Sequence, residues 1–193
     1  MDRRTALAGL GALAGALALP AVAAAPKAVR KPARLRAGDT VGLIEPAGFT
    51  ADSFSLDEVV ANIRAMGLVP KVAPHVMQRN GYLAGSDADR AADVNAMFAD
   101  KDVRAIFAIR GGWGCARILP LFDFDLIRAN PKLLTGFSDI TALHMAIAAK
   151  AGFPTIHGPN ASSSWGKLSV DAFRAVAGPS AWFMIVASTL MAA

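Results

Sequence analysis

The chain of 193 residues has one cysteine, one tyrosine and three histidines, and only 18% of its residues are charged. A single cysteine excludes a disulfide scaffold, and the absence of a C-x-x-C motif argues against a redox-active thiol protein. The few histidines, acids and the cysteine form no cluster with the spacing of metal ligands. What the chain has in excess is apolar residues, at 54%, which excludes a disordered polymer. We therefore expect a globular domain.

The net charge of +5 arises largely in one short run of basic residues. This run consists of Lys27, Arg30, Lys31, Arg34 and Arg36. No basic stripe with interleaved aromatic residues follows it, so the sequence gives no indication of nucleic-acid binding. We predict a solvated basic linker over residues 26–37.

The first 25 residues have the pattern of an export signal. Arg3 and Arg4 precede an Ala/Leu/Gly core at 6–19, and Pro20 is followed by the small residues 21–25 that suit a cleavage site. The core is shorter than the roughly 20 residues that a membrane span needs. We predict a cleaved signal peptide, with the paired arginines of the twin-arginine route, and a periplasmic or exported protein. The alternative is an uncleaved N-terminal anchor helix.

Between residues 38 and 176, short apolar runs alternate with longer amphipathic stretches. We expect strands at 40–47, 69–76, 103–110, 132–138 and 153–158, and helices at 55–66, 86–99, 116–127 and 139–151. Ser86 is suited to cap the second helix, with acidic residues in its first turn. This alternation predicts an α/β fold: an open, mostly parallel sheet of the flavodoxin or Rossmann type, flanked by helices. Ligands in such sheets bind at the carboxyl ends of the strands.

The turn after the third expected strand reads RGGWGCAR, residues 110–117. Arg117 stands where a dinucleotide fingerprint needs glycine or alanine, and no Gly-Lys-Ser/Thr follows as in a P-loop. Three glycines followed by Cys115 at a helix start resemble a nucleophile elbow, in which a sharp turn lifts the side chain clear of the sheet. The helix dipole would then lower the pKa of the thiol. The alternative is a buried small apolar cysteine beside a tight turn.

The run from Arg110 to His144, RGGWGCARILPLFDFDLIRANPKLLTGFSDITALH, resembles the LD-carboxypeptidase family, also called muramoyltetrapeptide carboxypeptidases. Microcin C self-immunity peptidases are relatives of that family. The segments 41–48, 81–100 and 157–167 resemble family motifs in the same order. The resemblance extends from about residue 36 to 176, over the family's N-terminal α/β domain.

The resemblance implies an activity. Family members remove the terminal D-alanine from a cell-wall tetrapeptide through an acyl-enzyme, without a metal or organic cofactor. The serine nucleophile of the family corresponds to Cys115 here, so the thiol would attack the peptide carbonyl. The backbone N–H groups of Ala116 and Gly112 would hold the oxyanion. The implied partner is a muropeptide, and family members are often homodimers.

The resemblance also points to substrate-binding residues. Trp113 in the glycine turn, and Ser138 and Asp139 at the next strand end, would shape the pocket or support the turn. Ser138 has the alternative role of capping the helix that follows. Among the histidines, we expect His144 to be a core or surface residue, and His157 at the same sheet edge as Cys115 is the stronger candidate for a substitute base. His75 is a weaker one.

Beyond residues 173–176 the resemblance fades. Family members continue into a C-terminal domain that supplies the glutamate and histidine of their triad, whereas residues 177–193 contain no acidic, basic or histidine residue. A frameshift or premature stop, an artificial boundary followed by vector residues, and a genuine short C-terminal helix are the three explanations. We expect the chain to be truncated and weakly active or inactive. The alternative is a non-catalytic muropeptide-binding or remnant domain.

Overall fold

The computed structural model describes residues 30–178, except for the side chain of Phe54. Five strands form one sheet in the order β2-β1-β3-β4-β5, and every neighbouring pair is parallel. The strands are β1 (Thr40–Ile44), β2 (Val69–Val72), β3 (Val103–Ala108), β4 (Leu133–Gly136) and β5 (Ile156–His157). The helices are α2 (Ser53–Ala65), α3 (Asp87–Ala99), α4 (Cys115–Ile118), α5 (Phe124–Ala129), α6 (Thr141–Ala146) and α7 (Lys167–Ala177). The predicted open parallel α/β sheet is confirmed.

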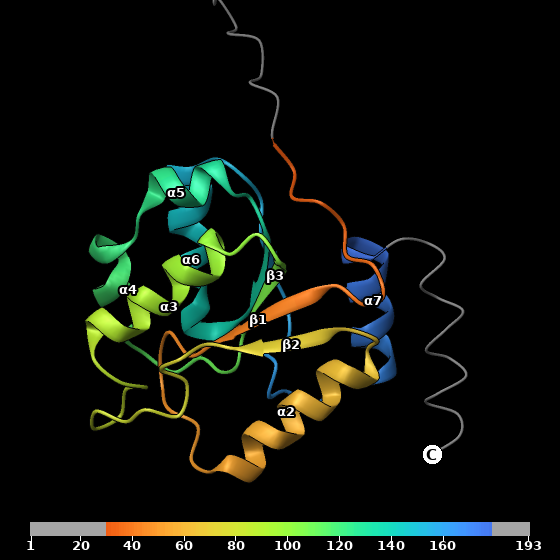
Figure 1. The fold of residues 1–193 in the computed structure, drawn as a ribbon, viewed down its shortest axis with the longest axis horizontal. Coiled ribbons are helices and arrows are strands. Elements are labelled where there is room, and N and C mark those ends of the chain that lie inside the picture. The colour runs from red at the N-terminus through yellow and green to blue at the C-terminus, as the bar shows by residue number, and fades with distance from the viewer. Residues whose placement is uncertain (1–29, 179–193) are drawn as a thin grey trace, which may run out of the picture.

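The strand order determines which helices cover which face of the sheet. The chain runs outward from β1 to β2 and then returns across β1 to β3, so right-handed connections place α2 and α3 on opposite faces. Figure 1 shows α2 and α7 on one side of the sheet and α3, α4, α5 and α6 on the other. The direction of winding reverses between β1 and β3, and doubly wound sheets bind ligands outside the carboxyl ends of the strands at this point.

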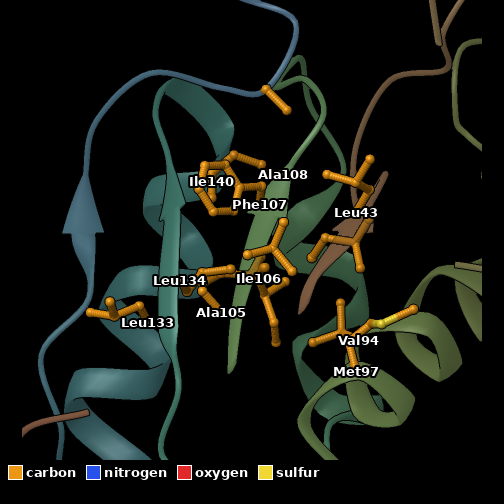
Figure 2. Close-up of a cluster of buried hydrophobic side chains, with 14 of the residues drawn as sticks. Leu43, Val94, Met97, Ala105, Ile106, Phe107, Ala108, Leu133, Leu134 and Ile140 are labelled. Atoms are coloured by element: carbon orange, nitrogen blue, oxygen red, sulfur yellow. The ribbon is translucent and has the colours of Figure 1, made fainter. Parts of the chain in front are cut away.

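The central strand β3 packs on both faces. On one face, Ile106 pairs in register with Gly42 of β1. Gly42 lies so close to Met97 of α3 that a Cβ on Gly42 would lie only 2.6 Å from the Met97 Sδ. On the other face, the ring of Phe107 lies 5.4 Å from that of Phe173 in α7. Figure 2 shows Met97, Ile106 and Phe107 within the apolar cluster around β3. This two-sided burial explains why β1, β3 and β4 are largely apolar, whereas the edge strand β2 is mostly exposed.

The expected element boundaries differ from the observed ones where a local breaker acts. The helix predicted at 116–127 is divided into α4, a 3-10 turn over Leu119–Leu121, and α5. Pro120 lies in that turn and has no N–H to continue a helix, and Asp123 caps α5 by accepting the N–H of Leu126 at 2.9 Å. By contrast, Ser86 caps α3 as predicted, accepting the N–H of Asp89 at 3.1 Å.

Two parts of the fold were not predicted. Helix α7 buries Val170 and Phe173, and none was expected at 167–177. Leu35 lies inside the segment predicted to be a solvated linker, yet it is fully buried and its N–H donates to the carbonyl of Ala177 at 2.7 Å. The end of the basic segment and α7 therefore hold one another against the sheet.

No helix among residues 30–178 is long and apolar enough to cross a membrane. The predicted signal peptide, residues 1–25, lies outside the described residues. So do residues 179–193 of the predicted tail 177–193.

We expect Phe107→Ala to reduce the free energy of unfolding by about 3–5 kcal/mol, because it leaves a cavity between β3 and α7. Urea denaturation measures this change. Leu168→Ala on α7 is the matched control, because its side chain is 84% exposed and its loss should cost less than about 0.5 kcal/mol. Equal effects of the two substitutions would show that α7 does not pack on β3.

Candidate functional site

A cavity of about 430 Å³ opens at the carboxyl edge of the sheet, where the loops after β1, β3, β4 and β5 meet. Its lining contains one charged side chain, that of Arg110, among hydroxyl, amide and glycine groups. The lining residues are Thr50, Ala51, Ser55, Arg110, Gly111, Gly112, Phe137, Ser138, Asn160, Ser162 and Ser163. The predicted site residues Gly112 and Ser138 are both in this set.

The glycine turn needs glycine at two positions for steric reasons. Gly112 has φ +130°, and a Cβ there would lie 2.4 Å from the hydroxyl oxygen of Tyr82. Gly114 has φ +113°, and a Cβ there would lie 2.6 Å from a methyl group of Leu83. Both values lie in the region that side chains rarely adopt, so the backbone can turn this tightly only without side chains.

Cys115 begins α4 directly after this turn, but its side chain is fully buried and does not line the cavity. The expectation that the turn lifts the thiol clear of the sheet is therefore wrong. The reason is the direction of the turn: Gly114 packs against Leu83 and Arg90, and Cys115 then points into the apolar core cluster. The alternative of a buried cysteine beside a tight turn describes its placement.

The pKa of the Cys115 thiol is raised, not lowered as predicted. Burial is the main cause, and the negative charge of Asp139 and its hydrogen bond with the thiol add to it, against a smaller opposing effect of Arg90. Helix α4 has only four residues, so its dipole is small, and the first N–H already donates to Oδ2 of Asp139 at 2.8 Å. The thiol is thus protonated at neutral pH in this geometry.

Arg90 of α3 holds the turn in place, and sequence reasoning missed it. Its guanidinium is fully buried, and Nη1 donates to the carbonyl oxygen of Pro46, which follows β1. The same Nη1 donates to the carbonyl oxygen of Gly114 at 3.2 Å. Nη2 pairs with Asp87 at 2.5 Å, and Asp87 also pairs with the exposed Arg117. The available signal was the acid–arginine spacing of three residues on the helix face that packs inward.

Ser138 and Asp139 follow β4 and have separate roles. Ser138 lines the cavity with φ +64°, a left-handed conformation that is uncommon for serine and concentrates at functional sites. It makes no capping hydrogen bond to the following helical turn, so the structure gives no support to the capping alternative. Asp139 lies instead at the Cys115 N–H and thiol, where it supports the glycine turn.

An aromatic pair borders the glycine turn. Trp113 is half exposed and stacks on Tyr82, with ring centroids 5.5 Å apart and an angle of 12° between the rings. Tyr82 is the single tyrosine of the chain and was not predicted to belong to the site. Ala116 and Gly112, the predicted oxyanion donors, are both exposed on either side of the buried Cys115.

The histidines lie apart from the thiol. His144 is buried, and its ring nitrogens bond to Thr155 Oγ1 at 2.8 Å and to the Gly136 carbonyl at 2.9 Å, as expected of a core histidine. The exposed His157 packs its ring 5.8 Å from that of His144. His75 pairs with Asp93 at 2.7 Å. Among residues 30–178, the charged groups that act on the thiol are Asp139 and Arg90, and neither is a histidine.

Glu45 is a second buried charge that sequence reasoning missed. Burial raises the pKa of its carboxyl, and hydrogen bonds from Thr50 and from the Met77 N–H oppose this rise, as does the positive charge of Arg110. Arg110 itself donates from Nη1 to the carbonyl of Phe49 at 2.7 Å. Glu45 and Arg110 thus stabilise the loop that follows β1 from two sides.

No group of three or more His, Cys, Asp or Glu side chains within the described part of the chain is arranged to hold a metal ion.

The sequence and the fold match those of known proteins. The family model for the LD-carboxypeptidase N-terminal domain matches residues 41–158, more than half of the chain. This chain belongs to the LD-carboxypeptidase family. It is 43% identical over 136 residues to a probable murein peptide carboxypeptidase of Bacillus subtilis, covering 70% of this chain and 42% of that protein. It is 37% identical over 123 residues to a murein tetrapeptide carboxypeptidase of Pseudomonas aeruginosa, covering 63% and 39%.

Solved structures of the same family superpose on the chain. An MccF-like protein of Bacillus anthracis matches with a TM-score of 0.73 and 29% identity, covering 77% of this chain and 47% of that one. A muramoyltetrapeptide carboxypeptidase of Oxalobacter formigenes matches with a TM-score of 0.65 and 25% identity, covering 71% and 47%. The chain therefore spans less than half the length of these relatives.

We expect Asp139→Asn to lower the pKa of the Cys115 thiol, because it removes a negative charge while keeping an oxygen that accepts the Cys115 N–H. Alkylation by iodoacetamide as a function of pH reports this directly, since the chain has one cysteine. The rate should rise at lower pH in the variant. Asp125→Asn, at a side chain that is 90% exposed, is the control and should leave the profile unchanged. Identical profiles for Asp139→Asn and the unaltered chain would contradict the assignment.

We expect Arg90→Met to reduce the free energy of unfolding by about 2–4 kcal/mol, because the buried Pro46 carbonyl loses its side-chain donor and the Gly114 carbonyl keeps only the N–H of Arg117. Chemical denaturation measures the loss. Arg117→Met is the matched control: it pairs with the same Asp87 but is 54% exposed, and its removal should cost less than about 1 kcal/mol. A similar cost for both would mean that Arg90 does not hold the turn.

Proposed function

We propose that this chain is the substrate-recognising half of an LD-carboxypeptidase that removes the terminal D-alanine of murein tetrapeptides, with Cys115 as nucleophile. The observation that carries the proposal is the placement of the turn 110–115. It lies at the point of the sheet where ligands of doubly wound folds bind, beside the cavity that contains Arg110. The names of the Bacillus subtilis and Pseudomonas aeruginosa relatives support the substrate class.

The proposed reaction is acyl transfer. In the proposed reaction the turn must first move so that the buried Cys115 thiol reaches the cavity, where it gives up its proton to water. Its sulfur then forms a bond to the peptide carbonyl carbon, and the N–H groups of Gly112 and Ala116 stabilise the oxyanion. The C–N bond breaks, the amine of D-alanine takes a proton from water and leaves, and a second water hydrolyses the thioester to the peptide acid and the free thiol. Trp113 borders the substrate from the exposed side of the turn.

Proton transfer is the demanding step in this chain. Burial and Asp139 keep the thiol protonated, and residues 30–178 bring no histidine to it. In the family, as the sequence resemblance implies, a glutamate and a histidine of the C-terminal domain fill that role. We therefore propose that turnover by this chain is slow, by about 10⁴-fold or more relative to an enzyme with its base in place.

A second function is favoured by the same observation. A fully buried, protonated thiol beside an open polar cavity suits recognition of a muropeptide without its cleavage. In either case we propose a periplasmic or exported location, which the export signal predicted for residues 1–25 supports and where murein peptides arise.

Incubation of the chain with murein tetrapeptide, followed by chromatographic assay of free D-alanine and calorimetry of binding, tests the proposal. We expect saturable binding and slow release of D-alanine, which Cys115→Ala abolishes while binding persists. Cys115→Ser is the matched variant, because it restores the hydroxyl nucleophile that the family resemblance implies. Binding without any release would support the second function. If the chain shows no binding and no release of D-alanine, both proposed functions are refuted.

A further inference from the structure

We infer that Arg110 and the hydroxyl-lined cavity around it form the subsite for the free C-terminal carboxylate of the peptide. This inference rests on the proposed function, because it states how the departing residue of the same substrate is recognised. A carboxypeptidase must distinguish a chain end from an internal peptide bond, and the carboxylate is the group that marks the end.

The first argument is charge. Among the described residues, Arg110 is the single charged one that lines the cavity, so this part of the chain gives the cavity one formal positive charge and no lining carboxylate. Arg90, Arg117 and Arg128, by contrast, each pair with an aspartate. Across residues 30–178 no ion pair within 4.0 Å joins Arg110 to an acidic side chain. The cavity is therefore electrostatically suited to an anion.

The nearby Glu45 interacts with Arg110 through space but forms no ion pair with it within 4.0 Å. It is buried and faces Arg110 from the end of β1, but its two oxygens already accept hydrogen bonds from Thr50 and from the Met77 N–H. The one hydrogen bond that the structure gives for the Arg110 guanidinium runs from Nη1 to the carbonyl of Phe49. A guanidinium has five N–H donors, so this bond orients the group and leaves donors for a bidentate carboxylate.

The neutral groups of the lining have the matching polarity. Asn160 is buried, and its Oδ1 accepts the N–H of Phe137 at 3.0 Å, so its NH₂ end is the one left for a ligand. Ser138 is held in a left-handed conformation at the cavity wall, with its Cβ 3.1 Å from where a Cβ on Gly111 would lie. Backbone strain of this kind is retained where a side chain must be aimed at one point.

The position of the cavity fits a departing residue. Gly111 and Gly112 form part of its wall, and Cys115 follows only three residues after Gly112 in the same tight turn. A peptide whose terminal carboxylate pairs with Arg110 would run its scissile bond across the glycine turn toward the start of α4. A cavity of about 430 Å³ is ample for one small amino acid and its water.

The test compares two ligands that differ in one group: murein tetrapeptide with a free C-terminal carboxylate, and the same peptide with a C-terminal amide. All binding is measured by calorimetry on the full chain carrying Cys115→Ala, so that no peptide is consumed. We expect the acid to bind about 10- to 100-fold more tightly than the amide, as for a charge-assisted hydrogen-bonded pair. In Arg110→Met this preference should vanish through weaker binding of the acid alone.

Arg104→Met is the matched control. Arg104 is an exposed arginine on β3, the same strand that leads to Arg110, but near its opposite end. The substitution changes the net charge equally and should leave the preference for the acid intact. Arg110→Lys serves if Arg110→Met does not fold by circular dichroism. In Arg110→Lys an ammonium group replaces the guanidinium and cannot bind the carboxylate with two parallel N–H groups. The preference for the acid over the amide should therefore fall several-fold.

The outcomes separate this inference from the proposed function. Equal binding of acid and amide by the unaltered Arg110 chain overturns the subsite but leaves muropeptide binding in place. So does a loss of both affinities to the same degree in Arg110→Met, or an unchanged preference in Arg110→Lys. If neither peptide binds, the proposed function fails, and N-acetyl-D-alanine and its amide then test the cavity by NMR shifts of the Gly111 and Gly112 amides. Shifts with the acid alone support the subsite, and shifts with both or neither refute it.

Discussion

The buried guanidinium of Arg90 is the interaction on which the geometry of the site depends. It reaches from α3 across the sheet edge and donates to the carbonyl groups of Pro46, after β1, and Gly114, before Cys115. Two loops that are distant in the sequence are thereby held together at the point where the sheet reverses its direction of winding. A buried charge is costly to place there, and its hydrogen bonds to the loops offset that cost only while both loops keep their conformation.

This clamp has a chemical consequence for the thiol. It stabilises a turn in which Cys115 points into the core, where Asp139 accepts its N–H and adds a negative charge beside the sulfur. Burial and that charge both favour the protonated thiol, and the single positive charge of Arg90 opposes them only in part. The exposed groups of the turn, Gly112 and Trp113, are left to form the surface that a ligand meets.

Local sequence patterns were sufficient to predict those secondary-structure elements that depend on neighbouring residues alone. The strands β1, β3 and β4 follow from apolar runs that are covered on both faces, and the start of α3 follows from Ser86. The helix predicted at 116–127 was wrongly taken as continuous, although Pro120 removes a donor and Asp123 can cap a new helix. Helix α7 was missed although Val170, Phe173 and Ala177 recur at helical spacing and are buried. What the local pattern could not give was its packing partner, Phe107, more than sixty residues earlier in the chain.

The sequence by itself determined the class of sheet, the family and the position of the glycine turn, because periodicity and motif spacing are properties of neighbouring residues. Tertiary structure alone decided the state of the thiol, because burial and the charges of Arg90 and Asp139 reach Cys115 from other parts of the chain. The same holds for the cavity around Arg110, whose wall is built from four separate loops. A pKa and a binding surface depend on what surrounds a group in space, and that is set only when the chain is folded.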